Sequence, residues 1–302
     1  MYPLIGINSR REPGRIADAE CDPLVVEELR SGQEPEVLRF LGERPGRTFG
    51  MTGFIVTNGL VSPHNYGAFY ACRNSLGELQ GVALIGRYIL VETRSDSGIE
   101  VFARLAQECR NAHLMLGEQR TVETFWDYYA DGGQAARRYC RELLFEQRLP
   151  VEVRETVAGL RLATLDDLEL VVPAHAQSAF EESGIDPLKE NAKLFRDRCA
   201  RRIERGQTWV WVESGRLMFK AEILTNTADV AYLEGVWVDP TERGKGVGLR
   251  CLSQLTRKLL SRTRSVCLLV NESSQAARRF YQKAGYEFVG RYDTIFLRRE
   301  VH

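Results

Sequence analysis

The chain has 302 residues, and its 41 Lys and Arg are balanced by 41 Asp and Glu, so the formal net charge at pH 7 is zero. With 44% hydrophobic and 27% charged residues it has the composition of a folded globular protein, which excludes disordered, collagen-like and disulfide-dense chains. No apolar run reaches the roughly 18 residues of a membrane span, and basic residues gather in neither half. We therefore expect neither a membrane nor a nucleic-acid partner.

The N-terminal segment holds no continuous apolar core of signal-peptide length, so we expect a cytoplasmic protein. The seven cysteines are widely spaced and form no CxxC pair, which favours reduced thiols. The four histidines show no spacing typical of a metal site, and we expect no bound metal.

The first half contains a predicted hairpin and, near its end, a change of pattern that marks a domain boundary. Residues 74–85 predict a tight turn between two apolar strands. Residues 134–148 show a helical pattern that ends at Leu149-Pro150, and Val151–Arg154 begins a new alternation. We therefore predict two domains, 1–150 and 151–302, with a linker near 148–157.

Residues 213–224 repeat the pattern of residues 74–85, with Gly215 at the place of Gly77. Two explanations stay open: an internal duplication, or two unrelated hairpins of the kind that any α/β domain contains.

The second half predicts an α+β layout with a mixed, mostly antiparallel sheet. Strands are expected at 158–163, 208–213, 216–224, 229–238 and 266–270, followed by a closing pair at 286–291 and 294–299. Helices are expected from Thr164 to about 178, at 188–205, directly after the glycines at 244–248, and at 274–284. An acidic loop, 181–187, is expected before the basic second helix.

A strand that runs into a glycine-rich loop and then a helix is the most informative segment. Arg243-Gly-Lys-Gly-Val-Gly248 leaves backbone N–H groups unobstructed, and the helix that follows adds a partial positive charge, so the turn suits a phosphate or pyrophosphate. A dinucleotide fingerprint fails because residues 249 and 251 are Leu and Cys, and a Walker loop fails because Gly246 follows Lys245.

This loop resembles the pyrophosphate signature of the GNAT superfamily of acetyl-coenzyme A dependent N-acyltransferases. The matching residues are Arg243, Gly244, Lys245, Gly246, Val247 and Gly248. Residues 271–288 are similar to a second block of the family, with Asn, Ala, Tyr and Gly-Tyr in the same order. The resemblance covers about 158–302 and implies a GNAT fold there, an α/β sandwich-like α+β arrangement.

The chain is also similar to a bacterial subgroup in which an uncharacterised domain precedes the GNAT domain. The matching residues are Phe180–Glu182, Gly184, Asp186-Pro187, Phe219–Glu222 and Gly235–Pro240. The first half is then a second α/β domain of unknown role, and one reading makes it a degenerate GNAT copy without the phosphate loop. Such a copy would shape the acceptor cleft or form a homodimer contact.

The resemblance implies roles for the cofactor-binding residues. The strand that ends at Val238 is expected to splay from 266–270 and admit the pantetheine arm. Backbone groups of Val236, Trp237 and Val238 would bind that arm, and a similar N–H would stabilise the oxyanion of the tetrahedral intermediate. Core packing is the alternative for the Trp237 side chain. Asn271 would bind the pantetheine amides, cap the next helix, or do both.

Catalytic and acceptor roles follow in the same way. Tyr281 is expected to protonate the departing thiolate, with aromatic packing as the alternative. Glu234 is the first candidate for the general base and Glu222 the second, unless Glu222 is simply ion-paired with Lys220. Glu181 and Glu182 would attract a cationic acceptor, unless they form only a solvated face.

We predict an N-acetyltransferase of EC class 2.3.1 that moves an acetyl group from acetyl-CoA to a primary amine by direct transfer in a ternary complex. The acceptor is a small molecule or a peptide of unknown identity. No Cys or Ser with a paired His indicates a covalent route. The alternatives are a non-catalytic acyl-CoA-binding regulatory module, an enzyme for a longer or charged acyl group, and a nucleotide-binding protein.

Overall fold

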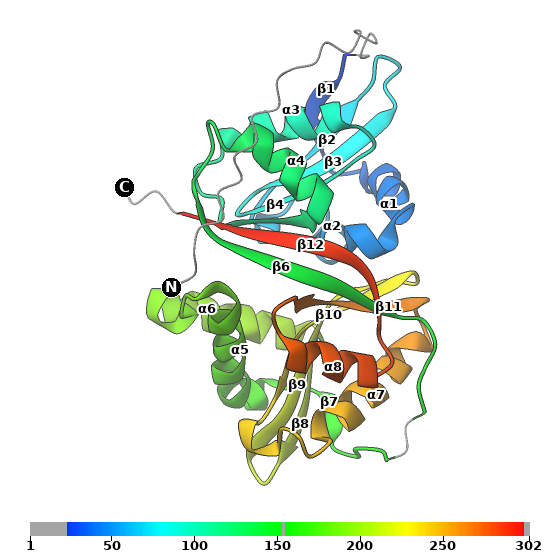
Figure 1. Ribbon diagram of the computed structural model, residues 1–302, viewed down its shortest axis with the longest axis vertical. Coiled ribbons are helices and arrows are strands. Elements are labelled where there is room, and N and C mark those ends of the chain that lie inside the picture. The colour runs from blue at the N-terminus through cyan, green and yellow to red at the C-terminus, as the bar shows by residue number, and fades with distance from the viewer. Residues whose placement is uncertain (1–22, 153–154, 299–302) are drawn as a thin grey trace.

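The two halves of the chain repeat one order of elements in a computed structural model that describes residues 23–152 and 155–298 (Figure 1). Apart from short 3-10 helices, each half runs strand, two helices, three strands, helix, strand, helix, strand. The first half comprises β1 (Val25–Glu28), α1 (Glu34–Gly42), α2 (Pro45–Asn58), β2 (Gly67–Arg73), β3 (Leu79–Gly86), β4 (Tyr88–Thr93), α3 (Asp96–Gln107), β5 (Leu114–Glu118), α4 (Gln119–Tyr129) and β6 (Ala136–Gln147). The second comprises β7 (Leu160–Leu162), α5 (Leu168–Ser183), α6 (Pro187–Glu204), β8 (Thr208–Glu213), β9 (Arg216–Asn226), β10 (Val230–Val238), α7 (Val247–Leu260), β11 (Ser265–Asn271), α8 (Gln275–Lys283) and β12 (Glu287–Leu297).

This shared order decides between the two explanations of the repeated hairpin. The turns at Gly77 and Gly215 join β2 to β3 and β8 to β9, at equivalent places in the two halves. Both glycines have a left-handed backbone, with φ of 80° and 74°. The fold is thus an internal duplication, and the first half is a second copy of the same α/β unit.

All the strands belong to one sheet, in the order β1-β2-β3-β4-β5-β12-β6-β11-β10-β9-β8-β7. Each half contributes four antiparallel strands followed by a parallel pair, β4 with β5 and β10 with β11. The last strand of each half then inserts beside the other half, because β12 pairs with β5 and β6 pairs with β11. Figure 1 shows β6 and β12 side by side across the middle of the molecule.

Three sequence predictions are wrong. Residues 134–148 form strand β6 and not a helix: Leu143-Leu-Phe145 is buried on both faces of a central strand, so it lacks the alternation that distinguishes a strand. The expected closing pair is the single strand β12, with an irregularity between Phe288 and Gly290. Glu181 and Glu182 lie in the last turn of α5, which continues to Gly184 and its left-handed cap, and not in a loop. The remaining strands and helices of the second half occur close to their predicted bounds.

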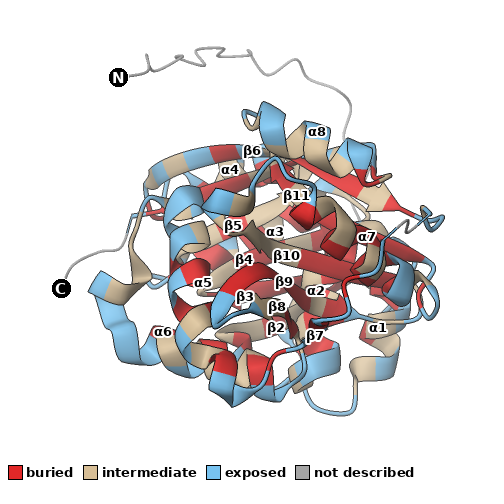
Figure 2. Cartoon of the chain, turned by 90° about the horizontal axis from the view of Figure 1, so that it is seen from below, coloured by how far each residue is buried: buried red, intermediate tan, exposed pale blue. Residues whose placement is uncertain are grey.

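The two faces of the sheet are covered by different helices. On one face α7 and α8 pack on Leu233, Leu268 and Phe145 in the largest core cluster of buried residues. On the other, α2 brings Phe49 onto Tyr232 of β10, with ring centroids 4.1 Å apart, α5 covers the rest of β9 and β10, and α6 packs on α5. Figure 2 shows the buried residues gathered along the central strands between these layers.

Within the described ranges, no helix is both long and apolar enough to cross a bilayer. The six cysteines found there are free thiols, in line with the sequence, and Cys21 lies outside the described residues.

Candidate active site

The site begins where β10 and β11 separate. Their parallel pairing extends only from Val230 and Ser265 to Leu233 and Leu268, and β10 then continues without β11 to Val238. This confirms the predicted splay. On its other edge β10 stays paired with β9, but the register shifts between Glu234 and Trp237, and Gly235 at this bulge has φ of 56°. Backbone groups of β10 therefore line an open seam.

The glycine loop lies at the end of this seam. Gly246 is the N-cap residue of α7, no side chain caps the helix, and its first turn contains no acidic residue. Gly244 and Gly246 have φ of 80° and 84°, and an added Cβ at either would meet open space. The first N–H groups of α7 thus face an unfilled space, an arrangement that favours a bound anion.

Four residues of the loop have roles that the sequence did not distinguish. Gly248 is needed for packing, because a Cβ there would lie 2.8 Å from Val238 and 3.2 Å from Phe280. The Val247 side chain is buried in the core, so only its backbone can reach a ligand. Arg243 and Lys245 are exposed: Arg243 Nε donates to the Val238 carbonyl at 3.2 Å, and Lys245 pairs with Glu242.

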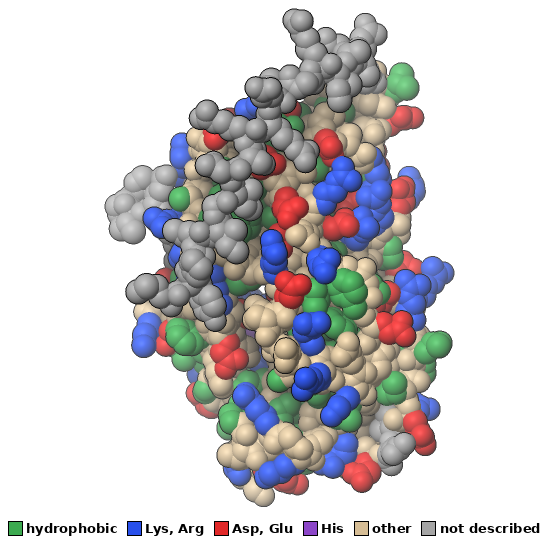
Figure 3. All heavy atoms as spheres, viewed as in Figure 1, with side chains coloured by type: hydrophobic (Ala, Val, Ile, Leu, Met, Phe, Trp, Pro, Cys, Tyr) green, Lys and Arg blue, Asp and Glu red, His purple; other side chains and the backbone are tan. Residues whose placement is uncertain are grey.

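Tyr281 approaches the seam from the face that carries α7 and α8. It is half-buried on α8, packs edge-on against Phe280 at 5.0 Å between ring centroids, and adjoins the core cluster. Burial, and then the nearby Glu182 carboxylate, raise the pKa of its phenol. The phenol is therefore protonated at neutral pH, the state that a proton donor needs. Lys and Arg side chains are spread over this face of the molecule (Figure 3).

The opposite face of the seam carries carboxylates. Residues alternate between faces along a strand, so Glu234 shares the face of Tyr232, which is covered by α2 and α5. Glu142 of β6 lies opposite Asn271 at the end of β11 and belongs to the same face. Burial raises the pKa of Glu142, to which Thr294 donates a hydrogen bond. The first half thus supplies a residue to this cleft that the sequence analysis missed.

Glu182 lies close to these carboxylates, whereas Glu181 does not. Cys140 of β6, on the same face as Glu142, contacts the Glu182 carbonyl at 3.9 Å. Although the Glu182 residue as a whole is exposed, desolvation of its carboxyl, together with Glu234 and Glu142, raises the pKa to about 8. Glu181 accepts a hydrogen bond from Gln177 on the outer surface of α5.

A network of charged and titratable side chains underlies the bulge. Lys220 donates to the Gly235 carbonyl and to Glu222, each at 3.1 Å, and is completely buried. Arg202 of α6 bonds both Glu222 and Glu234, the latter at 2.8 Å. His175 Nδ1 of α5 lies 3.1 Å from Glu222, although it is poorly aligned for a hydrogen bond. Four elements are therefore tied together directly behind the opened strand.

This network changes the interpretation of Glu222. Burial alone would raise the pKa of its carboxyl, but Arg202, His175 and Lys220 outweigh burial and hold the pKa well below its usual value. Both carboxylate oxygens are bound to cationic partners or to His175, and the residue is not exposed. The ion pair with Lys220 that was the alternative reading is present. Glu222 is thus placed as an anchor of the bulge, out of reach of a substrate proton.

Asn271 and Trp237 are both engaged with the protein. The Asn271 side-chain oxygen accepts from the N–H and the hydroxyl of Ser273, while Ser274 caps α8, so Asn271 shapes the turn before the helix and is not its cap. The Trp237 indole N–H donates to Gln177 of α5 at 3.0 Å, and its ring packs partly into the core. Val236 packs similarly against the core under α7.

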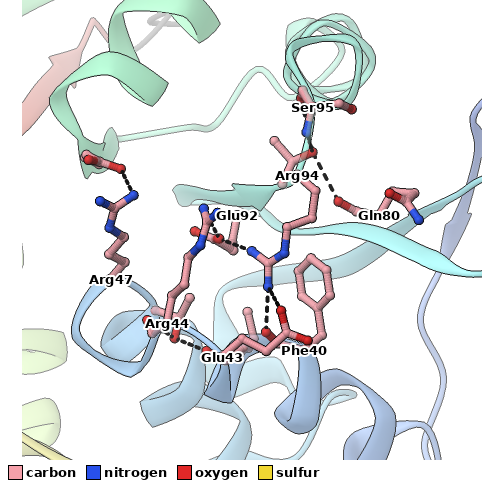
Figure 4. Close-up of polar contacts among 12 residues, drawn as sticks. Phe40, Glu43, Arg44, Arg47, Gln80, Glu92, Arg94 and Ser95 are labelled. Atoms are coloured by element: carbon pink, nitrogen blue, oxygen red, sulfur yellow. Dashed lines mark hydrogen bonds and ion pairs between the residues drawn. The ribbon is translucent and has the colours of Figure 1, made fainter. Parts of the chain in front are cut away.

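The equivalent region of the first half is closed. Only residues 94–95 connect β4 to α3, where residues 239–246 connect β10 to α7. Ser95 caps α3 with its own hydroxyl, and Asp96 puts a negative charge in the first turn. Arg94 folds back onto Glu92, Glu43 and the Phe40 carbonyl, as Figure 4 shows. This half has no phosphate loop among its described residues.

Comparison with known proteins agrees with this geometry. Residues 172–286 match the model of the Acetyltransferase (GNAT) family. The second half of the chain thus contains a GNAT-family domain. The GNAT match spans the seam, the glycine loop and Tyr281.

Similar solved structures extend over both halves. An acetyltransferase from the GNAT family of Colwellia psychrerythraea is 13% identical, with 91% of this chain and 100% of that chain covered and a TM-score of 0.53. A Drosophila protein is 12% identical, with 93% and 100% covered and a TM-score of 0.63. A tandem GNAT protein from the clavulanic acid biosynthesis pathway is 12% identical, with 93% and 100% covered and a TM-score of 0.55. No curated protein is significantly similar in sequence. These likenesses fit the two-domain arrangement of the fold described above.

Replacement of Lys220 by Met tests the network. The change leaves Glu222 buried with one cation fewer, and removing one partner of a buried pair costs about 3–5 kcal/mol of unfolding free energy. Urea denaturation of Lys220→Met measures this cost, with Lys189→Met as a control because Lys189 is exposed. The double variant Lys220→Met with Glu222→Gln should recover part of the loss. Equal stability of the single variant and the wild type would contradict a network that holds the bulge.

Proposed function

We propose that the protein transfers an acetyl group from acetyl-CoA to a primary amine in a ternary complex. The observation that carries the proposal is the seam between β10 and β11, which ends at the uncapped N-terminus of α7. The pyrophosphate would lie on the N–H groups that follow Gly244 and Gly246, and the pantetheine arm along β10 beyond Leu233. The acceptor would enter from the face of α5 and α6.

The chemistry divides between the two faces. The amine nitrogen attacks the thioester carbon, the bulge N–H groups stabilise the oxyanion, and the C–S bond then breaks. Glu234 receives the proton that the ammonium loses, directly or through water, and Arg202 holds this carboxylate by one oxygen. Tyr281 donates its proton to the departing thiolate. The face that the amine enters thus takes up the amine proton, and the face that carries α7 and α8 supplies the proton of the thiol.

Direct transfer is favoured over an acyl-enzyme. Cys140 is the thiol placed beside Glu182, and burial raises its pKa. A protonated thiol is a poor nucleophile. The coarser conclusion, acetyl transfer in general, rests on family membership, whereas the acceptor and the acyl length are part of the proposal.

The loop can be tested by calorimetric titration with acetyl-CoA and CoA. Gly246→Glu places a carboxylate at a position with φ of 84° in front of α7, and we expect binding to fall by at least about 100-fold through repulsion and lost N–H contacts. Gly77→Glu is the matched control, because Gly77 has φ of 80° and equally open surroundings in the first half. If the wild type binds neither ligand, the transferase proposal fails.

Tyr281→Phe separates an enzyme from a non-catalytic acyl-CoA-binding module. We expect unchanged acetyl-CoA affinity and a turnover about 10²-fold lower, measured as thiol release in a screen of primary amines. Tyr139→Phe serves as the control, because Tyr139 is an exposed tyrosine of β6. Binding by the wild type without release of thiol for any amine would favour the module. Full activity of Tyr281→Phe would assign the acid elsewhere.

The raised pKa of Glu182 predicts a pH dependence for cationic acceptors. The carboxyl is neutral below about pH 8 and anionic above it, so its attraction for a cation appears as the pH rises through this value. The ratio of kcat/KM of the wild type to that of Glu182→Gln should therefore increase between pH 7 and 9. Glu181→Gln should show a constant ratio over the same range. A flat ratio for Glu182→Gln would remove this residue from the acceptor site.

A further inference from the structure

A cavity of about 420 Å³ lies on the first-half side of the molecule, on the sheet face that also carries Glu234 and Glu142. Its floor is apolar and consists of Leu144, Cys267 and Tyr292 from the three central strands. Its wall is the start of α2, and its rim is formed by the ends of β5 and β6, the β9–β10 turn and the start of β11. Volumes of about 300–1,000 Å³ are typical of small-molecule sites.

Because the fold is duplicated, this cavity can be compared with the proposed acceptor cleft of the second half. The last strands of the two halves meet with Glu142 opposite Tyr292, and these two residues lie opposite Asn271 of β11 and Glu118 of β5. Glu118 and Tyr292 line the cavity, just as Asn271 and Glu142 flank the proposed acceptor cleft. The junction of α1 and α2 borders the cavity at the place where α5 and α6 border the cleft. The cavity therefore occupies the acceptor position of the first half.

This position has no route to acetyl transfer. The connection from β4 to α3 is short, its helix is capped by Ser95, and the Arg94 side chain is bonded to Glu43 and the Phe40 carbonyl (Figure 4). A ligand of the cavity would therefore be bound without reacting by the proposed mechanism.

The charges around the cavity are of both signs and nearly equal in number. The lining contains the guanidinium groups of Arg44, Arg47, Arg148 and Arg264 and the carboxylates of Glu118, Glu146 and Asp229. They form pairs at the rim, Arg47 with Glu118 at 2.5 Å, Arg148 with Glu146 at 2.9 Å and Arg264 with Asp229 at 3.2 Å. Arg44 pairs with Glu92, which does not line the cavity, at 3.2 Å. An anion would face the carboxylates and a cation the guanidinium groups. A small zwitterion finds a partner for each of its charges.

The start of α2 strengthens the match at the negative end of such a ligand. Arg44 is the N-cap residue, no side chain caps the helix, and Pro45 has no N–H to satisfy. An added Cβ at Gly46 would meet open space. Arg44 and Arg47 flank this end of the helix, as Figure 4 shows. A carboxylate there would meet the helix N-terminus and two guanidinium groups together.

We propose that this cavity binds a free α-amino acid. The carboxylate lies at Arg44, Arg47 and the start of α2, the ammonium group lies at Glu118 and Glu146, and the side chain points to the floor at Leu144, Cys267 and Tyr292. The site is separate from the proposed transferase site, so either assignment can fail without the other.

The test measures the melting temperature of the full chain with each of the common amino acids at 10 mM and constant ionic strength. We expect at least one amino acid with an apolar side chain to raise the melting temperature by about 2–4 °C, the shift for roughly 1 kcal/mol of binding stabilisation. Citrate, inorganic phosphate and 1,4-diaminobutane serve as anionic and cationic probes. Equal or larger shifts with any of these three, or no shift with any amino acid, would overturn the proposal.

Two variants locate the effect. Gly290 lines the cavity, has open space beyond its Cβ position and has no left-handed backbone, so Gly290→Phe fills the cavity without backbone strain. Gly42→Phe is the matched control, an equally open glycine that does not line the cavity. The shift should vanish in Gly290→Phe and persist in Gly42→Phe and Gly246→Glu. A shift that survives in Gly290→Phe would overturn the assignment. If Gly290→Phe does not fold, Arg47→Gln should lose the shift and the exposed Arg39→Gln should keep it.

Discussion

The exchange of β6 and β12 is the constraint on which the rest of the structure depends. These two strands pair with each other along most of their length, and each also completes the sheet of the opposite half. Either half alone would expose an unpaired edge at β5 or β11, an arrangement that proteins avoid. The same exchange brings Glu142 and Cys140 to the cleft of the second half. The first half is therefore required to build the proposed acceptor face, although its described residues hold no phosphate loop.

The opened strand creates a second requirement. A bulge removes ladder hydrogen bonds from β10, and the Gly235 carbonyl then needs a donor inside the protein. Lys220 supplies it, but a buried ammonium group must itself be neutralised, which requires Glu222, and Glu222 in turn is bound by Arg202. The bulge thus explains why the charged side chains of Lys220, Glu222 and Arg202 lie in contact with one another. Glu234 is the last residue of this network. It is bonded by Arg202 and lies at the surface of the cleft.

Local pattern was sufficient for part of this structure. Alternation and a glycine turn predicted β8, β9 and β10 within a few residues, and the loop at 243–248 was visible because its glycines must keep their unusual backbone. The same signals failed for β6, because a central strand buried on both faces does not alternate. Its partners, β11 and β12, lie more than a hundred residues further along the chain, and no local signal encodes that pairing.

The residues of the candidate site also divide into those that a local pattern indicates and those that it does not. The sequence analysis placed Arg202 only within the basic helix at 188–205, but Phe195, Cys199 and Ile203 of α6 are buried at helical spacing, and Arg202 lies beside this face. That spacing was a usable signal for a cation turned inward. Nothing local could have indicated Glu142, because its place beside Asn271 results from the strand exchange. Residues that belong to one loop were thus predictable, whereas residues that converge from both halves were not.

The two copies differ most at a single connection. At residues 239–246 the chain has room for a glycine loop, so the N–H groups of α7 remain unmatched, whereas at 94–95 it has none and Ser95 satisfies those of α3. Asp96 then adds a charge that opposes any phosphate. A helix N-terminus is either capped by the protein or available to a ligand, because the same N–H groups serve both purposes. Stability in the first copy and the proposed anion binding in the second are therefore alternative uses of one structural position, which explains why the described residues of a duplicated fold hold one candidate seam.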